Sequence, residues 1–151
     1  MDYEIIHGLY NLLPNETLSE VMYKNLVAVG GVKYNDEEIK FAQQILDTYE
    51  GDYNIESAEE IISYSVENRN GGGSTDVGDV SWKVPTAGMS AATWVPGTSA
   101  HTWQAVAAGG TSIGIKGMLI AAKTIALTAQ DIFTNSDIII RAKKELEERI
   151  G

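Results

Sequence analysis

The sequence predicts an α/β fold in which helices pack on a small central sheet. Apolar residues recur at helical spacing in several segments that begin with a capping signal. Other short segments are rich in aliphatic and aromatic residues, which favours strands. The 151 residues are 44% apolar and 21% charged, which is typical of one globular domain with a buried core.

The first predicted element is a strand over 3–13, where aliphatic and aromatic side chains concentrate and Pro14 follows. An amphipathic helix comes next. Thr17 with Glu20 forms a capping box for it, because the hydroxyl and the carboxylate can satisfy each other's free backbone amides. Gly30 then ends this helix.

Two further capping signals follow. Asn35 with Glu38 predicts a second amphipathic helix that Gly51 ends, and Ser57 with Glu60 predicts a third, shorter one. The remaining predicted elements are short strands over 84–86 and 89–95, a long alanine-rich helix over 113–133 and a last helix capped by Asn135 or Ser136.

Charge and composition exclude several classes of protein. The net charge of −10 repels phosphate backbones, so nucleic-acid binding is not expected. Without cysteine there are no disulfides or thiol catalysis. The acidic N-terminus does not resemble a signal peptide, and Lys116, Lys123 and Gln130 interrupt the longest apolar stretch, so we expect a cytoplasmic protein without a membrane span.

A glycine-rich segment over 71–79 is one candidate for a binding loop, because glycines let the backbone approach a ligand closely. No Gly-Lys-Ser/Thr follows it, which excludes a phosphate-binding P-loop. Asp76 and Asp79 could act as acid and base, but their spacing equally suits turn and N-cap roles. As a bare pattern, a flexible loop with a capped turn is the better interpretation.

The two histidines, His7 and His101, are too few for a complete metal site, which needs about three protein ligands. We interpret His7 as structural or surface. His101 is equally well explained as a hydrogen-bonded loop histidine or as a ligand, although small residues before it and Trp103 after it suit a pocket wall. Ser74, Asp76 and His101 are the residue types of a catalytic triad, but no nucleophile elbow accompanies them.

Several short sequence motifs resemble those of a known family in their residues and their order. They are GSTDVGDVSW over 73–82, VPT over 84–86, GTSAHTWQ over 97–104 and the glycine-rich start of the segment over 112–123. They resemble the C-terminal half of the B-type p-aminobenzoyl-glutamate hydrolases, within the aminoacylase, auxin-conjugate hydrolase and carboxypeptidase superfamily. The resemblance implies that 1–14 is the last strand of an inserted lid domain and 15–151 the C-terminal portion of a zinc-peptidase-like catalytic domain.

The resemblance also implies a chemistry. In this family two divalent metals, zinc or manganese, activate a water that attacks an amide carbonyl. His101 matches the metal-ligand histidine of the C-terminal half. The residues that match the lining of the active-site cleft are Gly73, Ser74, Thr75, Asp76, Thr102 and Trp103. Thr75 and Ile115 depart from the family pattern, where some relatives carry a glutamate and a histidine.

The family's general base and its other metal ligands belong to the N-terminal half and have no counterpart here. The chain is therefore expected to be a fragment of a metal-dependent amidohydrolase of small-molecule amides with a glutamate-like moiety, inactive and without bound metal when alone. Two alternatives remain, a non-catalytic domain that binds a partner or self-associates, and a half-site that complements a separate N-terminal chain. Missing sheet partners would leave apolar surface exposed, which predicts a homo-oligomer. We expect His101 in an open cleft near Asp76.

Overall fold

The computed structural model describes residues 2–4, 6–65 and 75–151, and in these residues it contains helices and no strand. The predicted central sheet is therefore wrong. The helices are α1 Glu16–Val29, α2 Asp36–Leu46, the 3-10 helix η1 Glu56–Glu59, α3 Val77–Ser81, α4 Trp103–Gly109, α5 Ser112–Thr134 and α6 Ser136–Ile150.

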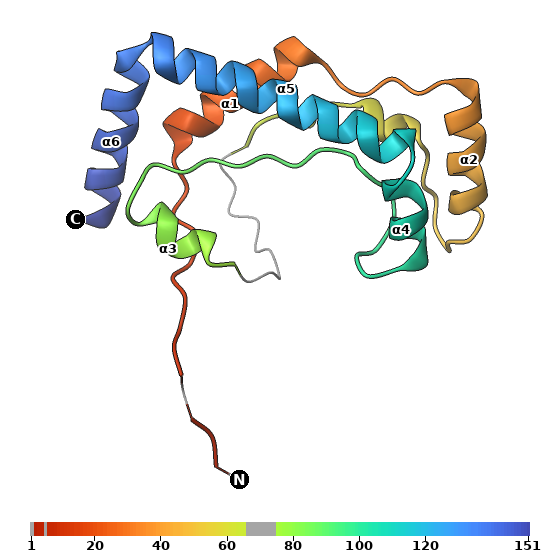
Figure 1. Ribbon diagram of the computed structural model, residues 1–151, viewed down its shortest axis with the longest axis horizontal. Coiled ribbons are helices and arrows are strands. Elements are labelled where there is room, and N and C mark those ends of the chain that lie inside the picture. Colours follow the sequence, from red (N-terminus) through yellow and green to blue (C-terminus); the bar gives the residue numbers. More distant parts are fainter. Residues whose placement is uncertain (1, 5, 66–74) are drawn as a thin grey trace.

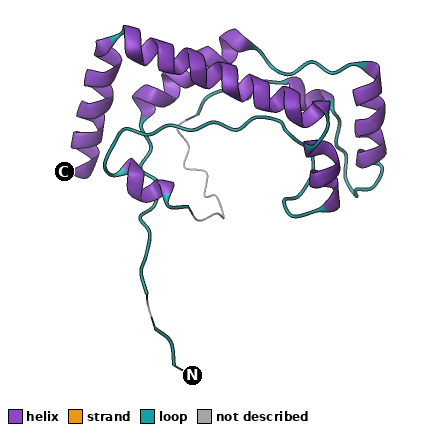
Figure 2. Ribbon diagram, viewed as in Figure 1, coloured by secondary structure: helices purple, strands orange, loops and turns teal. Residues whose placement is uncertain are grey.

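The long helix α5 organises the molecule. It packs against α1, α4 and α6. Figure 1 shows α6 turning down from the C-terminal end of α5, whereas α2 and α4 lie at the N-terminal end of α5. Between α2 and α4, the described residues outside η1 and α3 are loops, and the segment over 82–102 runs below α5 (Figure 2). By length and composition alone α5 could cross a bilayer, a test that the core helix of a soluble protein also passes.

The predicted strand over 3–13 is not formed in its described residues, and two of its amides bond to side chains of α3 instead. The amide of Tyr10 donates to the carboxylate of Asp79 at 2.9 Å, and the amide of Leu13 donates to the hydroxyl of Ser81 at 2.8 Å. A strand becomes part of a sheet only when its amides and carbonyls bond to a neighbouring backbone. Side chains of a short helix replace that neighbour here.

The predicted strands over 84–86 and 89–95 are also wrong, for a different reason. This segment crosses the molecule from α3 to α4 and packs directly on a helix (Figure 2). The carbonyl oxygen of Ala92 lies so close to Gly117 of α5 that no side-chain carbon would fit between them. An apolar, β-branched stretch looks the same in sequence whether it pairs with a strand or lies on a helix.

Most helix boundaries follow the capping residues. The capping box of Asn35 and Glu38 is confirmed at the start of α2, and Asn135 caps α6 as one of the two predicted residues. The box at Thr17 is wrong by two positions, since Asn15 caps α1. The predicted third helix is replaced by η1, whose C-cap Glu60 is already extended.

The buried core is small and lies at the α2 and α4 end of α5. Its main cluster consists of Ala42, Ile45, Leu46, Ile55, Val95, Ala108 and Ile113, while Ile138, Ala142 and Leu146 are buried on α6. The chain exposes 10674 Å², whereas a compact protein of 16.3 kDa exposes about 7,500 Å². Much apolar surface thus stays open, including Ile115, Met118 and Ile125 of α5 and Val106 of α4.

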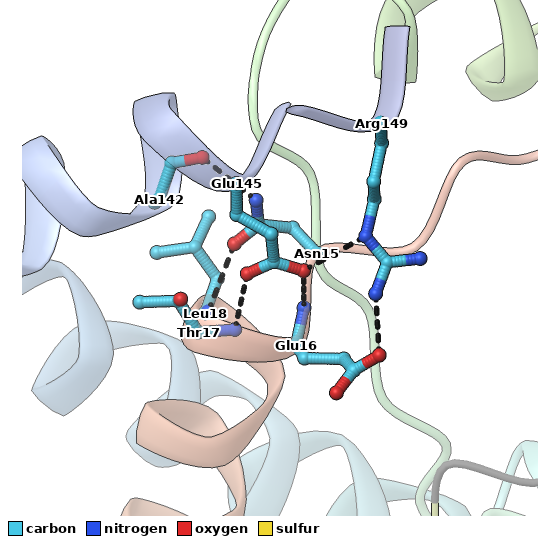
Figure 3. A network of polar contacts seen from close by, with 7 residues as sticks. All are labelled: Asn15, Glu16, Thr17, Leu18, Ala142, Glu145 and Arg149. Atoms are coloured by element: carbon cyan, nitrogen blue, oxygen red, sulfur yellow. Dashed lines mark hydrogen bonds and ion pairs between the residues drawn. The ribbon is translucent and has the colours of Figure 1, made fainter. Parts of the chain in front are cut away.

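A polar network docks α6 on the first turn of α1 (Figure 3). The buried side chain of Asn15 accepts from the amide of Leu18 at 3.1 Å and donates to the carbonyl of Ala142 at 2.9 Å. The Glu145 carboxylate accepts from the amides of Glu16 at 2.6 Å and Thr17 at 2.9 Å. These are amides that a helix leaves without intrahelical partners.

Glu145 makes the junction sensitive to acid. Burial alone would raise the pKa of its carboxyl, but the two amides and Arg149 bring the pKa below its ordinary value of 4.5. A carboxyl whose pKa is lower in the folded than in the unfolded chain stabilises the fold at a pH above its unfolded-state pKa. This stabilisation is lost as the pH falls through its folded-state pKa.

Glu145→Gln should therefore cost about 2 kcal/mol at pH 7 and less at a pH below the lowered folded-state pKa of Glu145, where the native carboxyl is itself protonated. Urea unfolding followed by circular dichroism at both pH values measures the difference. Glu148→Gln is the matched control, since Glu148 is an exposed acid of the same helix whose oxygen lies 3.7 Å from Lys144. An equal cost of Glu145→Gln at both pH values would contradict the assignment.

Candidate functional site

His101 lies in an exposed turn just before α4. Its φ of 63° is in the left-handed region, and it is the one non-glycine residue with positive φ in the part of the chain that the structure describes. Such a conformation costs about 1–2 kcal/mol outside glycine, and strained residues gather at functional sites. The backbone therefore supports a functional role for His101 independently of the sequence motif.

The residues after His101 start α4. The Thr102 hydroxyl accepts from the amide of Ala105 at 3.3 Å and donates to the carbonyl of Ser99 at 2.8 Å, so it caps the helix and closes the turn. Trp103 is 59% exposed. The imidazole of His101 and the indole of Trp103, two residues apart, are thus both exposed, which suits contact with a ligand or with another polypeptide. The sequence did not predict α4 itself.

The glycine-rich segment lies elsewhere. Gly73 and Ser74 are outside the described residues. Thr75 accepts a hydrogen bond from the amide of Val77 at 3.3 Å, and Asp76 occupies the N-cap position of α3 without a side-chain capping bond.

Figure 1 shows α3 and α4 at opposite ends of the molecule. The structure therefore does not bring Asp76 and His101 into one cleft. The connecting segment runs along α5, with Ala92 against Gly117 and Val95 in the core, and this keeps the two ends apart.

The described residues do not fit a complete metal centre. No three His, Asp or Glu side chains among residues 2–4, 6–65 and 75–151 converge on one point. A zinc or two-metal site takes about three protein ligands per ion. His101 can therefore supply one ligand, and the others would have to come from outside these residues.

A groove of about 770 Å³ lies between α1 and two segments, over 57–65 and 88–92. Apolar side chains such as Met22, Leu26 and Met89 line it. Neither His101 nor Asp76 belongs to its lining. The sequence does not predict this groove, because it depends on how α1 packs over loops that were expected to be a helix and strands.

Comparison with known proteins places the chain beside a hydrolase. The relative is the B subunit of p-aminobenzoyl-glutamate hydrolase from Escherichia coli (strain K12), with 36% identity over 160 aligned residues. The alignment covers 90% of this chain and 33% of that protein, so the chain spans one third of the length of its relative. No protein-family description and no solved structure matches. The chain is therefore a relative of this hydrolase, and the predicted relationship is confirmed.

Proposed function

We propose that the chain is the C-terminal portion of a metal-dependent amidohydrolase that cleaves an amide bond to a glutamate-like moiety. The similarity to the Escherichia coli p-aminobenzoyl-glutamate hydrolase carries the proposal. The exposed, left-handed His101 supports it, because the segment that resembles the family's metal-binding string is also the segment whose backbone is strained.

In this proposal His101 would hold one ion of a two-metal centre of zinc or manganese, and such a centre would supply the Lewis acidity that amide hydrolysis needs. The described residues offer no complete site, so we assign no step of the reaction to this chain alone. What the chain contributes is an imidazole on an exposed turn, with Thr102 and Trp103 beside it. The remaining ligands and the general base would come from another segment or chain.

The exposed apolar surface favours a related proposal for the isolated chain. The total exposed area of the chain exceeds that of a compact protein of this mass by about 3,000 Å², and apolar side chains such as Ile115 and Met118 of α5 are part of the exposed surface. An interface of standard size buries about 1,600 Å². Without a complementing segment, we propose that copies of the chain associate through this surface as homo-oligomers.

One complementation experiment tests both proposals. The chain is produced alone and together with the part of the Escherichia coli relative that it does not match. With added zinc or manganese, hydrolysis of p-aminobenzoyl-glutamate should appear only in the mixture. Light scattering should show an oligomer of the chain alone and a defined complex in the mixture. Turnover by the chain alone would reject the half-site, and a monodisperse monomer would reject self-association.

A further inference from the structure

The turn that contains His101 is held by the loop that follows α2. The segment over 48–53 follows α2 and contacts residues on both sides of His101, before it in sequence through Gly97 and Thr98 and after it through Gln104. Nothing in the sequence joins these positions, since the bonded residues are 49 and 56 positions apart. The contacts therefore come from the tertiary structure alone.

The first contact is a chain of hydroxyl groups. The Thr98 hydroxyl donates to the carbonyl of Val95 at 2.6 Å, and the Tyr49 hydroxyl lies 2.6 Å from the same Thr98 oxygen. Because Thr98 has one hydroxyl proton and uses it on Val95, Tyr49 is the donor in its bond to Thr98. Val95 is 1% exposed, so this chain ties the turn to a buried carbonyl of the core.

Two further contacts join the segment over 48–53 to this turn. The Gln104 amide donates to the Thr48 hydroxyl at 3.2 Å, and Thr48 in turn donates to the carbonyl of Ile45 at 2.7 Å. The ring of Tyr53 packs so closely on Gly97 that a side-chain carbon there would come within 2.8 Å of it. Gly97 itself has a φ of 83°, so this position favours glycine in both respects.

We propose that Tyr49 is a positioning residue for His101: its hydroxyl, through Thr98, holds the turn in the strained conformation that aims the imidazole. The expected effect of Tyr49 on catalysis rests on the proposed function, whereas its expected effect on the conformation of His101 does not. A non-glycine residue stays in the left-handed region only when its surroundings over-determine it. The bond from Thr102 to the carbonyl of Ser99 closes the turn locally, and the Tyr49–Thr98–Val95 chain adds the restraint that ties the turn to the core.

The structural part is tested on the full 151-residue chain labelled with ¹⁵N-histidine. The chain has two histidines, so two backbone signals are expected, and His7→Gln assigns them. We expect an order parameter of about 0.85 for His101 in the unmodified chain and below about 0.6 in Tyr49→Phe. Tyr53→Phe is the matched control, because it keeps the ring that packs on Gly97 and should leave His101 unchanged.

A second pair of variants separates the hydroxyl chain from any general loss of packing. Thr98→Val should lower the order parameter of His101 as Tyr49→Phe does. Thr98→Ser keeps the hydroxyl and should leave that order parameter at its native value. The double variant Tyr49→Phe with Thr98→Val should add nothing to either single change. An ordered His101 in both Tyr49→Phe and Thr98→Val would overturn the proposal, whatever the chain catalyses.

The catalytic part is tested in the complemented assembly. Tyr49→Phe should lower kcat about 10-fold, as loss of an outer partner of a metal ligand does, and leave KM within about twofold. An unchanged kcat beside a disordered His101 would instead contradict the role of His101 itself, which is the proposed function. The two failures are therefore distinguishable.

Discussion

Amide hydrolysis by the complemented assembly should fall at least about 10³-fold when His101 is replaced by alanine. Loss of one metal ligand forfeits several kcal/mol of charge stabilisation in the transition state, and each 1.4 kcal/mol is a factor of ten in rate. Steady-state kinetics with zinc or manganese, together with metal content after dialysis, measure the effect. His7→Ala is the matched control, since His7 is also exposed, and it should leave the rate unchanged.

Substitutions of His101 should also change the stability of the chain, which can be measured independently of activity. Because His101 is in the left-handed region, His101→Gly should be more stable than His101→Ala by about 0.5–1 kcal/mol, although both are inactive. Urea unfolding of the two variants gives the difference. Full activity of His101→Ala would contradict the metal-ligand role, and equal stability of the two variants would contradict the strained turn.

Gly117→Ala should destabilise the chain by about 3 kcal/mol, near the upper end for overpacking. Alanine normally stabilises a helix interior relative to glycine by about 1 kcal/mol. In α5 the added methyl group would overlap the carbonyl of Ala92, a backbone group that cannot rotate away, and would press on Thr93 at 3.1 Å. The melting temperature should fall by about 10 °C, measured by circular dichroism.

Gly88→Ala is the control for this change. A side-chain carbon at Gly88 would meet nothing within 4 Å, and the residue lies in the same crossing segment as Ala92. We expect a shift of less than about 0.5 kcal/mol, as for surface substitutions generally. If Gly117→Ala were as stable as Gly88→Ala, the crossing segment would not lie against α5 as the structure has it.

The helices were predictable because their signals are local. The Asn35–Glu38 capping box and the apolar spacing after it lie within one stretch of sequence, and they gave α2 its start. The same holds for α5, which was expected over 113–133 and runs over Ser112–Thr134. Short helices carry weaker local signals, and α3 and α4 were not predicted.

The strands were not predictable in the same way, because a sheet is a relation between distant segments. The stretch over 3–13 has the residue types of a strand, but its amides bond to Asp79 and Ser81, about seventy residues away. The site followed the same pattern. His101 was proposed as a site residue from its string of neighbours and stays a prediction, whereas its expected proximity to Asp76 required a fold that the structure does not show.

The sequence by itself determined the relationship to a hydrolase, the helices with strong caps and the histidine to test, since each is encoded in contiguous residues. Only the tertiary structure decided that His101 is strained, that Tyr49 bonds to Thr98 in the turn before it, and that Gly117 must lack a side chain. These features depend on which distant segments meet, and contacts between segments far apart in sequence leave no local pattern.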